Sequence, residues 1–243
     1  MMNANSIQGL HIELTNMCTL KCPGCARTRF QNQFPKYWQN KNLHHDKLFS
    51  FLDIDLNDKH IVLCGNYGDP IYHPEFLKIV ETFKNQRAKL KIITNGSYKF
   101  AAWWKELCKL LDHNDCIVFS VDGIPDNFTQ YRINGDWSSI EQAMKIVANS
   151  KCHSIWSYLI FAYNENTIEK AQMLSSSLGI NQFEIAFSDR FDEQTEHYKP
   201  TNHENLGKRF NSQLEFKQGH KITVQPKCAG NKQHFITADG YYS

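Results

Sequence analysis

The sequence predicts an α/β protein whose parallel strands form a partial, TIM-like (β/α)6 barrel. Short apolar segments rich in β-branched residues alternate along the chain with longer segments that have the period of a helix. Polar or glycine-containing segments follow several of these strands directly, and parallel barrels and sheets bind their ligands at that edge. The order of the elements therefore predicts both the architecture and the edge at which a site should lie.

Six short segments are predicted to be strands because they are apolar and are bounded by polar or turn-forming residues. They cover residues 9–14, 60–64, 90–94, 116–121, 154–161 and 182–187. Five helices are expected between them, over residues 45–52, 74–85, 100–111, 137–149 and 167–178. Pro74 suits the first turn of its helix, and Asn166 with Glu169 has the spacing of a capping box.

The alternation ends after residue 188, and the polar stretch over residues 188–207 is expected to be a linker or a surface excursion. Two short strand-like segments, 221–225 and 234–237, are followed by the turn signal Asp239-Gly240 and predict a short C-terminal β-hairpin. We therefore expect a barrel core over residues 1–190 and a C-terminal extension over residues 191–243.

Composition and charge narrow the class of protein. With 243 residues the chain can bury one main apolar core, and 27 basic against 25 acidic residues give a formal charge of only +2. Such a balance gives no global attraction to nucleic acid or to an anionic membrane. No apolar run approaches the roughly 20 residues of a spanning helix, and the polar residues 1–9 lack the features of a secretory signal. We expect a soluble, cytoplasmic protein with neither a nucleic-acid nor a membrane partner.

Three of the eight cysteines, Cys18, Cys22 and Cys25, form a CxxxCxxC motif directly after the first predicted strand. In a cytoplasmic protein such crowding favours metal ligation over disulfides. Iron-sulfur clusters are held by thiolates and a cubane normally takes four, so three thiols leave one iron open to a small chelating molecule. A zinc site is the alternative, but structural zinc takes four ligands, usually in CxxC pairs, and no second pair lies nearby.

The spacing of this motif and its place after the first strand resemble the radical S-adenosylmethionine (SAM) superfamily. The resemblance implies that Cys18, Cys22 and Cys25 hold a [4Fe-4S] cluster that cleaves SAM to a 5′-deoxyadenosyl radical. It also implies an external one-electron donor such as flavodoxin or ferredoxin. In that family the residue before the third cysteine is commonly aromatic and packs near the adenine, whereas here it is Gly24.

The loop after the second strand resembles the Gly-Gly-Glu-Pro segment of the same family, with an aspartate in place of the glutamate. The resemblance assigns Gly65, Gly68, Asp69 and Pro70 to the amino group of SAM, since glycines let backbone approach a ligand closely. Taken alone, this loop would be read as an ordinary βα turn. Asn95, in a Thr-Asn-Gly segment that ends the third strand, is also similar to the family and is a further candidate for SAM binding.

The fourth strand ends in a Ser-Val-Asp-Gly segment that is followed by Tyr131-Arg132, an arrangement that resembles the SPASM and Twitch subgroup. By that resemblance Ser120 and Asp122 lie near the SAM ribose or the substrate. Arg132 pairs with the SAM carboxylate, which an arginine fork can bind bidentately. Asp122 is the one candidate for a catalytic residue, and it could instead cap the following turn. Arg132 could likewise be an ordinary surface arginine.

Residues 227–230, which include Cys228, resemble the opening of a SPASM or Twitch domain, where auxiliary iron-sulfur clusters bind. One thiol cannot hold a cubane, so Cys228 is only a candidate auxiliary ligand and we expect a truncated form of that domain. The other four cysteines fall in or beside predicted strands and helices and are expected to be small buried side chains: Cys64, Cys108, Cys116 and Cys152.

The resemblance implies an oxidoreductase or transferase in which SAM is cleaved reductively and a substrate hydrogen is abstracted. Modification of a peptide is the first expectation, because SPASM-type relatives often modify ribosomally made peptides. Radical modification of a small metabolite or a cofactor precursor is the second. A different class stays open as well: a non-catalytic iron-sulfur protein for electron transfer or redox sensing, which would bind no SAM.

Overall fold

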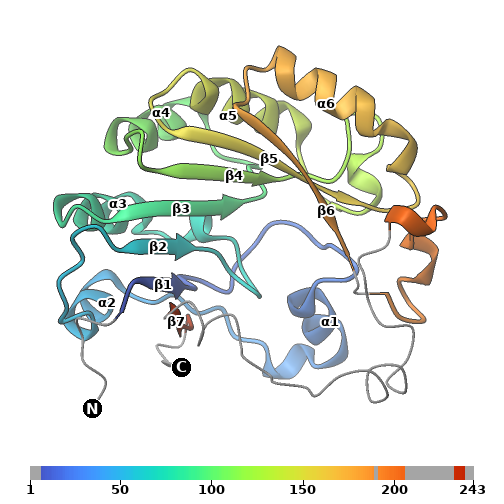
Figure 1. The fold of residues 1–243 in the computed structure, drawn as a ribbon. Coiled ribbons are helices and arrows are strands. Elements are labelled where there is room, and N and C mark those ends of the chain that lie inside the picture. Colours follow the sequence, from blue (N-terminus) through green and yellow to red (C-terminus); the bar gives the residue numbers. More distant parts are fainter. Residues whose placement is uncertain (1–6, 189–190, 206–232, 239–243) are drawn as a thin grey trace, which may run out of the picture.

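Parallel strands form one curved sheet in the computed structural model of the chain, which describes residues 7–188, 191–205 and 233–238 (Figure 1). Seven strands lie in the order β6-β5-β4-β3-β2-β1-β7, so each of the first six has its neighbour in sequence beside it. They are β1 (Gly9–Ile12), β2 (His60–Leu63), β3 (Lys89–Thr94), β4 (Cys116–Ser120), β5 (His153–Ile160), β6 (Gln182–Phe187) and β7 (Gln233–Ile236). Because all the pairings are parallel, the carboxyl ends of the strands meet at one edge.

Helices α3 to α6 lie along the outer face of this sheet, as Figure 1 shows. The α-helices are α1 (Ala26–Gln33), α2 (His45–Phe51), α3 (Phe76–Asn85), α4 (Ala101–Leu110), α5 (Trp137–Ala148) and α6 (Ile168–Ser177). Short 3-10 helices complete the connections: η2 (Pro35–Tyr37), η3 (Pro70–Tyr72), η4 (Phe128–Gln130), η5 (Glu165–Thr167), η6 (Glu196–Tyr198) and η7 (His203–Asn205). No helix in the described ranges is long and apolar enough to cross a membrane.

The core lies between the sheet and these outer helices. On α3, Phe76, Ile79, Val80 and Phe83 are buried at the spacing that puts them on one helix face. They belong to the same apolar cluster as strand residues such as Ile92. Complete burial of a side chain of this size stabilises the fold by about 1.5–3 kcal/mol. The outer helices therefore fix the curvature of the sheet, and with it the positions of the loops at its carboxyl edge.

The six strands and five helices predicted between residues 9 and 187 are confirmed, with every end within two residues of its expected place. Two of the predicted helix starts were wrong in detail. Pro74 precedes its helix, which begins at Phe76, and α6 begins at Ile168 with Thr167 as N-cap and no side-chain cap bond, so the capping box does not form. Helix α1, which was not predicted, and strand β7 at the edge of the sheet are also present.

Strand β7 extends the sheet beyond β1, with Gly9 opposite Gln233 and Ile12 opposite Ile236. The predicted strand at residues 234–237 is thus present, in parallel pairing with the first strand. The other half of the predicted hairpin, residues 221–225, lies outside the described residues, as does the turn Asp239-Gly240. The hairpin and the division of the chain at residue 190 therefore stay predictions.

Candidate functional site

A cavity of about 480 Å³ opens at the carboxyl edge of the sheet, between the loops that follow β1, β2, β3 and β4. The three thiols of the CxxxCxxC motif line it. Six of the other predicted site residues line it as well: Gly65, Gly68, Asp69, Asn95, Ser120 and Arg132. Pro70 and Asp122 are not part of its wall, and Cys228 lies outside the described residues. The structure thus brings most of the predicted residues to one place.

The cysteine loop is held in shape by its own backbone. The amide of Cys25 donates to the carbonyl of Cys22 (3.1 Å), and the amide of Lys21 donates to the carbonyl of Ile133 (3.0 Å). Burial raises the pKa of the Cys18 thiol to about 12 and also raises the pKa of Cys22. These two thiols are therefore protonated near neutral pH and would release protons on binding a metal.

The donor set suits a cluster better than a single ion. Within the described ranges, no three His, Cys, Asp or Glu side chains are grouped so that they could hold one metal ion. A cubane offers a separate iron to each thiolate, whereas a zinc ion needs all of its ligands around one point. The three cysteines of the motif lie around one cavity, whose wall also includes Cys64 from the end of β2, and this spread matches the first arrangement.

Asp69 joins the loop after β2 to the loop after β3. Its carboxylate accepts hydrogen bonds from the Asn95 amide (2.7 Å), the Asn95 side chain (2.5 Å) and the Thr94 hydroxyl (3.0 Å), and it caps η3 by accepting from Ile71 (3.3 Å). Burial raises the pKa of this carboxyl to about 6. The Asn95 side-chain nitrogen also lies 3.5 Å from the Cys18 sulfur. Asp69 therefore orients a donor that faces one of the three thiols.

Gly68 is needed where the loop after β2 touches the cysteine loop, and Gly65 is needed where the loop after β2 folds back on itself. A Cβ on Gly68 would lie 1.9 Å from the carbonyl oxygen of Thr15, and a Cβ on Gly65 would lie 2.6 Å from the carbonyl oxygen of Gly68. The amide of Asp69 donates to the carbonyl of Met17 (2.8 Å) across the same contact. The absence of side chains thus lets this loop dock on the cysteine loop, which is a reason for glycine that needs no ligand.

Arg132 is held between two of the predicted residues. Its Nε donates to Asp122 (2.6 Å) and one Nη donates to Ser120 (2.8 Å), while its other Nη lies 4.0 Å from the Cys22 sulfur. The second oxygen of Asp122 accepts from the amide of Leu159 (3.1 Å). The turn after β4 is capped by Asn127, whose Oδ1 accepts from Ile124 (2.8 Å). The Asp122 carboxylate is thus engaged with Arg132 rather than with the turn.

Arg27 is a wall residue that the sequence interpretation did not single out. It is only 5% exposed and lines the cavity from α1. One of its terminal nitrogens donates to the carbonyl of Leu20 and the other to Gln31 (3.2 Å), whereas its Nε has no hydrogen-bond partner in the described part of the chain. Its position two residues after Cys25 was the only signal available in the sequence.

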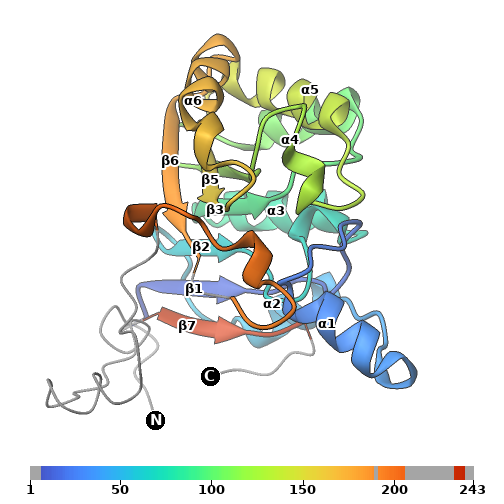
Figure 2. The same cartoon turned by 90° about the vertical axis from the view of Figure 1, so that its right-hand side faces the viewer.

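The segment after β6 passes in front of the sheet and ends beside α1 in Figure 2, and its Phe191 and Tyr198 pack against the apolar cluster that contains Leu20 and Cys22 of the cysteine loop. Asp192 pairs with Arg29 of α1, and the amide of Ala162 donates to the carbonyl of Tyr198 (2.9 Å). The Tyr198 ring lies 5.2 Å from that of Tyr131, which borders the cavity. Part of the stretch expected to be a linker or surface excursion therefore packs over the site.

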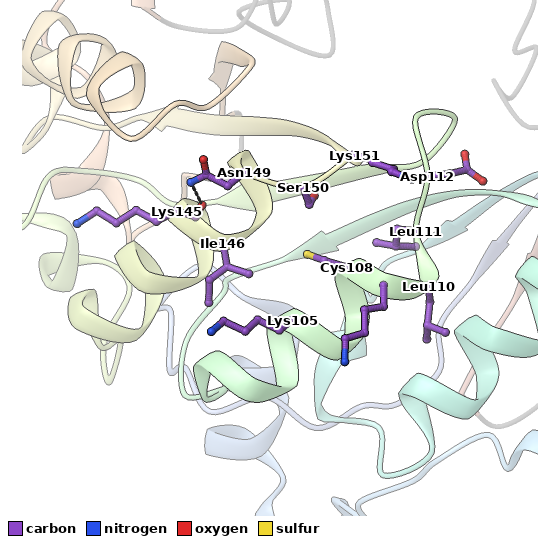
Figure 3. Close-up of a pocket in the computed structure, with 11 residues that line it drawn as sticks. Lys105, Cys108, Leu110, Leu111, Asp112, Lys145, Ile146, Asn149, Ser150 and Lys151 are labelled. Carbon is purple, nitrogen blue, oxygen red and sulfur yellow. Dashed lines mark hydrogen bonds between the residues drawn. The ribbon is translucent and has the colours of Figure 1, made fainter.

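A second cavity, of about 900 Å³, lies between α4 and α5 (Figure 3). It is formed near the ends of these helices, which lead into β4 and β5, and thus at the amino edge of the sheet. Lysine side chains such as Lys105 and Lys145 border it, but none of the predicted site residues does. The predicted site residues lie at the opposite, carboxyl edge of the sheet.

Comparison with known proteins gives one family match. The model of the radical SAM superfamily matches residues 12–175. A tungsten-containing aldehyde ferredoxin oxidoreductase cofactor-modifying protein of Pyrococcus furiosus is 28% identical over 120 residues, which are 48% of this chain and 31% of that protein.

Solved structures share the fold at low identity. SuiB of Streptococcus suis bound to S-adenosylmethionine matches 97% of this chain and 59% of its own, with a TM-score of 0.63 and 12% identity. SuiB bound to the precursor peptide SuiA gives a TM-score of 0.61 at 12% identity, with 97% and 58% covered. The protein anSMEcpe with bound AdoMet gives 0.57 at 15% identity, with 74% and 50% covered. The chain thus spans about a third of the curated relative and well under two thirds of SuiB.

Proposed function

The chain belongs to the radical SAM superfamily, and from this premise we propose that Cys18, Cys22 and Cys25 hold a [4Fe-4S] cluster at which SAM is cleaved reductively. Members of this family use such a cluster together with SAM. The single observation that carries the proposal is the convergence of the three thiols with Asp69, Asn95, Ser120 and Arg132 on one cavity.

The residues that line the cavity fit both a [4Fe-4S] cluster and SAM. Three thiols supply the soft ligands that iron-sulfur clusters take, and they leave one iron for a chelating ligand. Arg132 keeps one Nη toward Cys22, and the Nε of the buried Arg27 is unpartnered within the described structure, so positive charge faces the thiolates that the cluster would need. When bound, the cluster and SAM would supply the one-electron chemistry, namely cleavage of SAM and removal of a hydrogen from the substrate.

The protein side chains would bind and orient SAM. Arg132 offers a guanidinium group to its carboxylate. The loop from Gly65 to Pro70 is assigned to its amino group, with Gly68 and Asp69 on the cavity wall and Pro70 as the first residue of η3 behind them. Ser120 and Asn95 are the remaining polar contacts. We assign Asp122 a positioning role, because its carboxylate holds Arg132.

We propose a peptide as the substrate, in a SPASM or Twitch-like member of the family. SuiB, which has the same fold, has been solved with its precursor peptide SuiA. The second candidate is a cofactor precursor, since the Pyrococcus furiosus relative is a cofactor-modifying protein by name. An electron donor of the flavodoxin or ferredoxin kind, a cytoplasmic location, and the absence of nucleic-acid and membrane partners complete the proposal.

The test is formation of 5′-deoxyadenosine. The protein is reconstituted anaerobically with iron and sulfide, reduced with dithionite and given SAM, and the products are separated by chromatography. We expect 5′-deoxyadenosine from the unaltered protein and from Cys108→Ala, a cysteine on the outer helix α4, and none from Cys22→Ala. If a cluster forms but SAM stays intact and leaves the electron paramagnetic resonance signal unchanged, the non-catalytic electron-transfer alternative replaces this proposal.

A further inference from the structure

A row of aromatic side chains begins directly beyond the cofactor cavity. We call Phe30, Phe34, Tyr37, Trp38 and Tyr67 the aromatic wall. Successive rings are in contact, with centroid distances of 5.4 Å for Phe30 and Phe34, 5.9 Å for Phe30 and Trp38, and 6.3 Å for Trp38 and Tyr67. Tyr37 adds an edge contact to Phe34 at 6.5 Å. The wall therefore joins α1 and η2 to the loop after β2.

The aromatic wall borders a cavity of its own, of about 450 Å³. Phe30, Tyr37, Trp38 and Tyr67 line it. Tyr67 also lines the cofactor cavity, so its ring stands between the two spaces. Whatever occupies the aromatic cavity is thus held directly beside the place assigned to SAM.

The frame of this cavity is already formed. Two hydrogen bonds join Asn16 to Lys41. The Asn16 amide donates to the Lys41 carbonyl (3.2 Å), and the Lys41 amide donates to the Asn16 side chain (2.8 Å). The Asn16 side chain also donates to the carbonyl of Gln39 (2.8 Å), and the amide of Tyr67 donates to Glu13 (2.8 Å). Because hydrogen bonds to backbone groups hold both sides, a ligand would meet a preorganised pocket.

Several rings of the aromatic wall are exposed to solvent, and this exposure also points to a binding site. Tyr37 is 77% exposed, and Phe34, Tyr67 and Phe30 are 38–41% exposed. The large aromatic side chains of the core, such as Trp104 and Trp156, are completely buried. Contiguous exposed apolar surface with aromatic residues at its centre is typical of a binding site.

We propose that the aromatic cavity binds an aromatic side chain of a peptide substrate and so presents a neighbouring residue of that peptide to the cofactor cavity. The inference rests on the proposed function, which it extends from a peptide in general to one with an aromatic anchor. A volume of about 450 Å³ suits one or two side chains. Gln39 lines the same cavity, and its amide side chain is of a kind that can hydrogen-bond to the backbone of an extended peptide.

Blocked tripeptides provide the probe. Binding of N-acetyl-Gly-Trp-Gly-amide and N-acetyl-Gly-Ala-Gly-amide to the cluster-loaded protein with SAM is measured by ligand-observed nuclear magnetic resonance titration. We expect the tryptophan probe to bind about tenfold more tightly than the alanine probe, since ring stacking adds to the burial of apolar area. Trp38→Ala and Tyr37→Ala should each reduce that preference several-fold. Phe100→Ala, which removes a ring that is 83% exposed at the start of α4, should leave it unchanged.

The outcomes separate this inference from the proposed function, because 5′-deoxyadenosine is measured on the unaltered protein in the same samples. If SAM is cleaved but the two probes bind equally, or if Trp38→Ala and Phe100→Ala behave alike, the aromatic anchor is overturned and the proposed function stands. If the tryptophan probe is preferred but SAM is not cleaved, the proposed function fails while the cavity keeps its specificity. If Tyr37→Ala instead dissociates a dimer in light scattering, the wall is an interface between copies and the inference is overturned.

Discussion

The guanidinium group of Arg132 is fixed on two sides before any ligand binds. Asp122, which has no exposed surface, and Ser120 take two of its nitrogens, so the third can only point toward Cys22. A buried carboxylate whose oxygens are both engaged is poorly suited to exchange protons with a substrate. Asp122 instead holds the positive charge of Arg132 close to Cys22, where that charge would stabilise a ligand carboxylate and the thiolates.

Replacement of Asp122 by asparagine should lower the free energy of unfolding by about 1–3 kcal/mol, because Arg132, whose side chain is only 17% exposed, would lose its countercharge. Urea unfolding followed by circular dichroism measures this change. Asp126→Asn, four residues along and exposed, is the control and should stay within about 0.5 kcal/mol of the unaltered protein. Equal effects of the two substitutions would mean that the Asp122–Arg132 pair contributes nothing.

Asp69 makes stability depend on pH in a specific direction. Burial raises its pKa to about 6, well above the ordinary pKa of an aspartate, so the folded state binds the proton more tightly than the unfolded state does. Its contribution to the free energy of unfolding is therefore fully present below about pH 4 and is lost as the pH rises through 6, by up to about 3 kcal/mol. Unfolding of the cluster-free protein across this range, compared with Asp69→Ala, should show the difference. A constant difference between the two proteins would contradict the shift.

Among the elements, the loop after β1 and the loop after β2 behave as one unit. The contact of Gly68 with Thr15 and the bond from Asp69 to Met17 join them, and the three thiols depend on that contact for their common cavity. Helix α1 begins at Ala26, directly after its N-cap Cys25, the last of the three thiols, and continues the unit outward to the aromatic wall. Packing between backbones, rather than side-chain chemistry, thus sets the shape of the site.

Gly68→Ala should therefore reduce both stability and cluster content. Its Cβ would overlap the Thr15 carbonyl, and overpacking of this kind costs about 1–3 kcal/mol or forces the two loops apart. Iron and sulfide assays after anaerobic reconstitution measure the cluster. Gly179→Ala is the control, because Gly179 has a positive φ of 78°, which strains an alanine, but its Cβ would meet only Ala148, at 3.5 Å. That variant should lose some stability yet keep its cluster. Full cluster content in Gly68→Ala would show that the loops do not need this contact.

The strands and outer helices could be predicted because their apolar pattern is local, as on α3 with its face of Phe76, Val80 and Phe83. Helix α1 could not, since its sequence ARTRFQNQ has no apolar period and its folding depends on the cysteine loop. The thiols could be predicted from their spacing. The pairing of Asp122 with Arg132 could not, because it depends on how the chain returns through η4. The same holds for β7, whose pairing with β1 is a tertiary choice.

At the scale of the whole molecule, an open sheet brings the site together. Strands β6 and β7 form the two edges of the sheet over the residues that the structure describes, so these strands make an open sheet, and the cavity lies where the loops from four successive strands converge. The segment at residues 191–198 covers it on one side, and the aromatic wall adjoins it on another. Cofactor and substrate can thus meet at one edge of the fold while the core behind it stays unchanged.

We infer that three thiols hold a cluster with one iron left for SAM. The electron paramagnetic resonance spectrum of the reduced, reconstituted protein, recorded with and without SAM, tests this directly. We expect a [4Fe-4S] signal that SAM changes, that is lost in Cys18→Ala, Cys22→Ala and Cys25→Ala, and that Cys108→Ala retains. A signal that SAM leaves unchanged, or one that survives loss of any of the three cysteines, would contradict it.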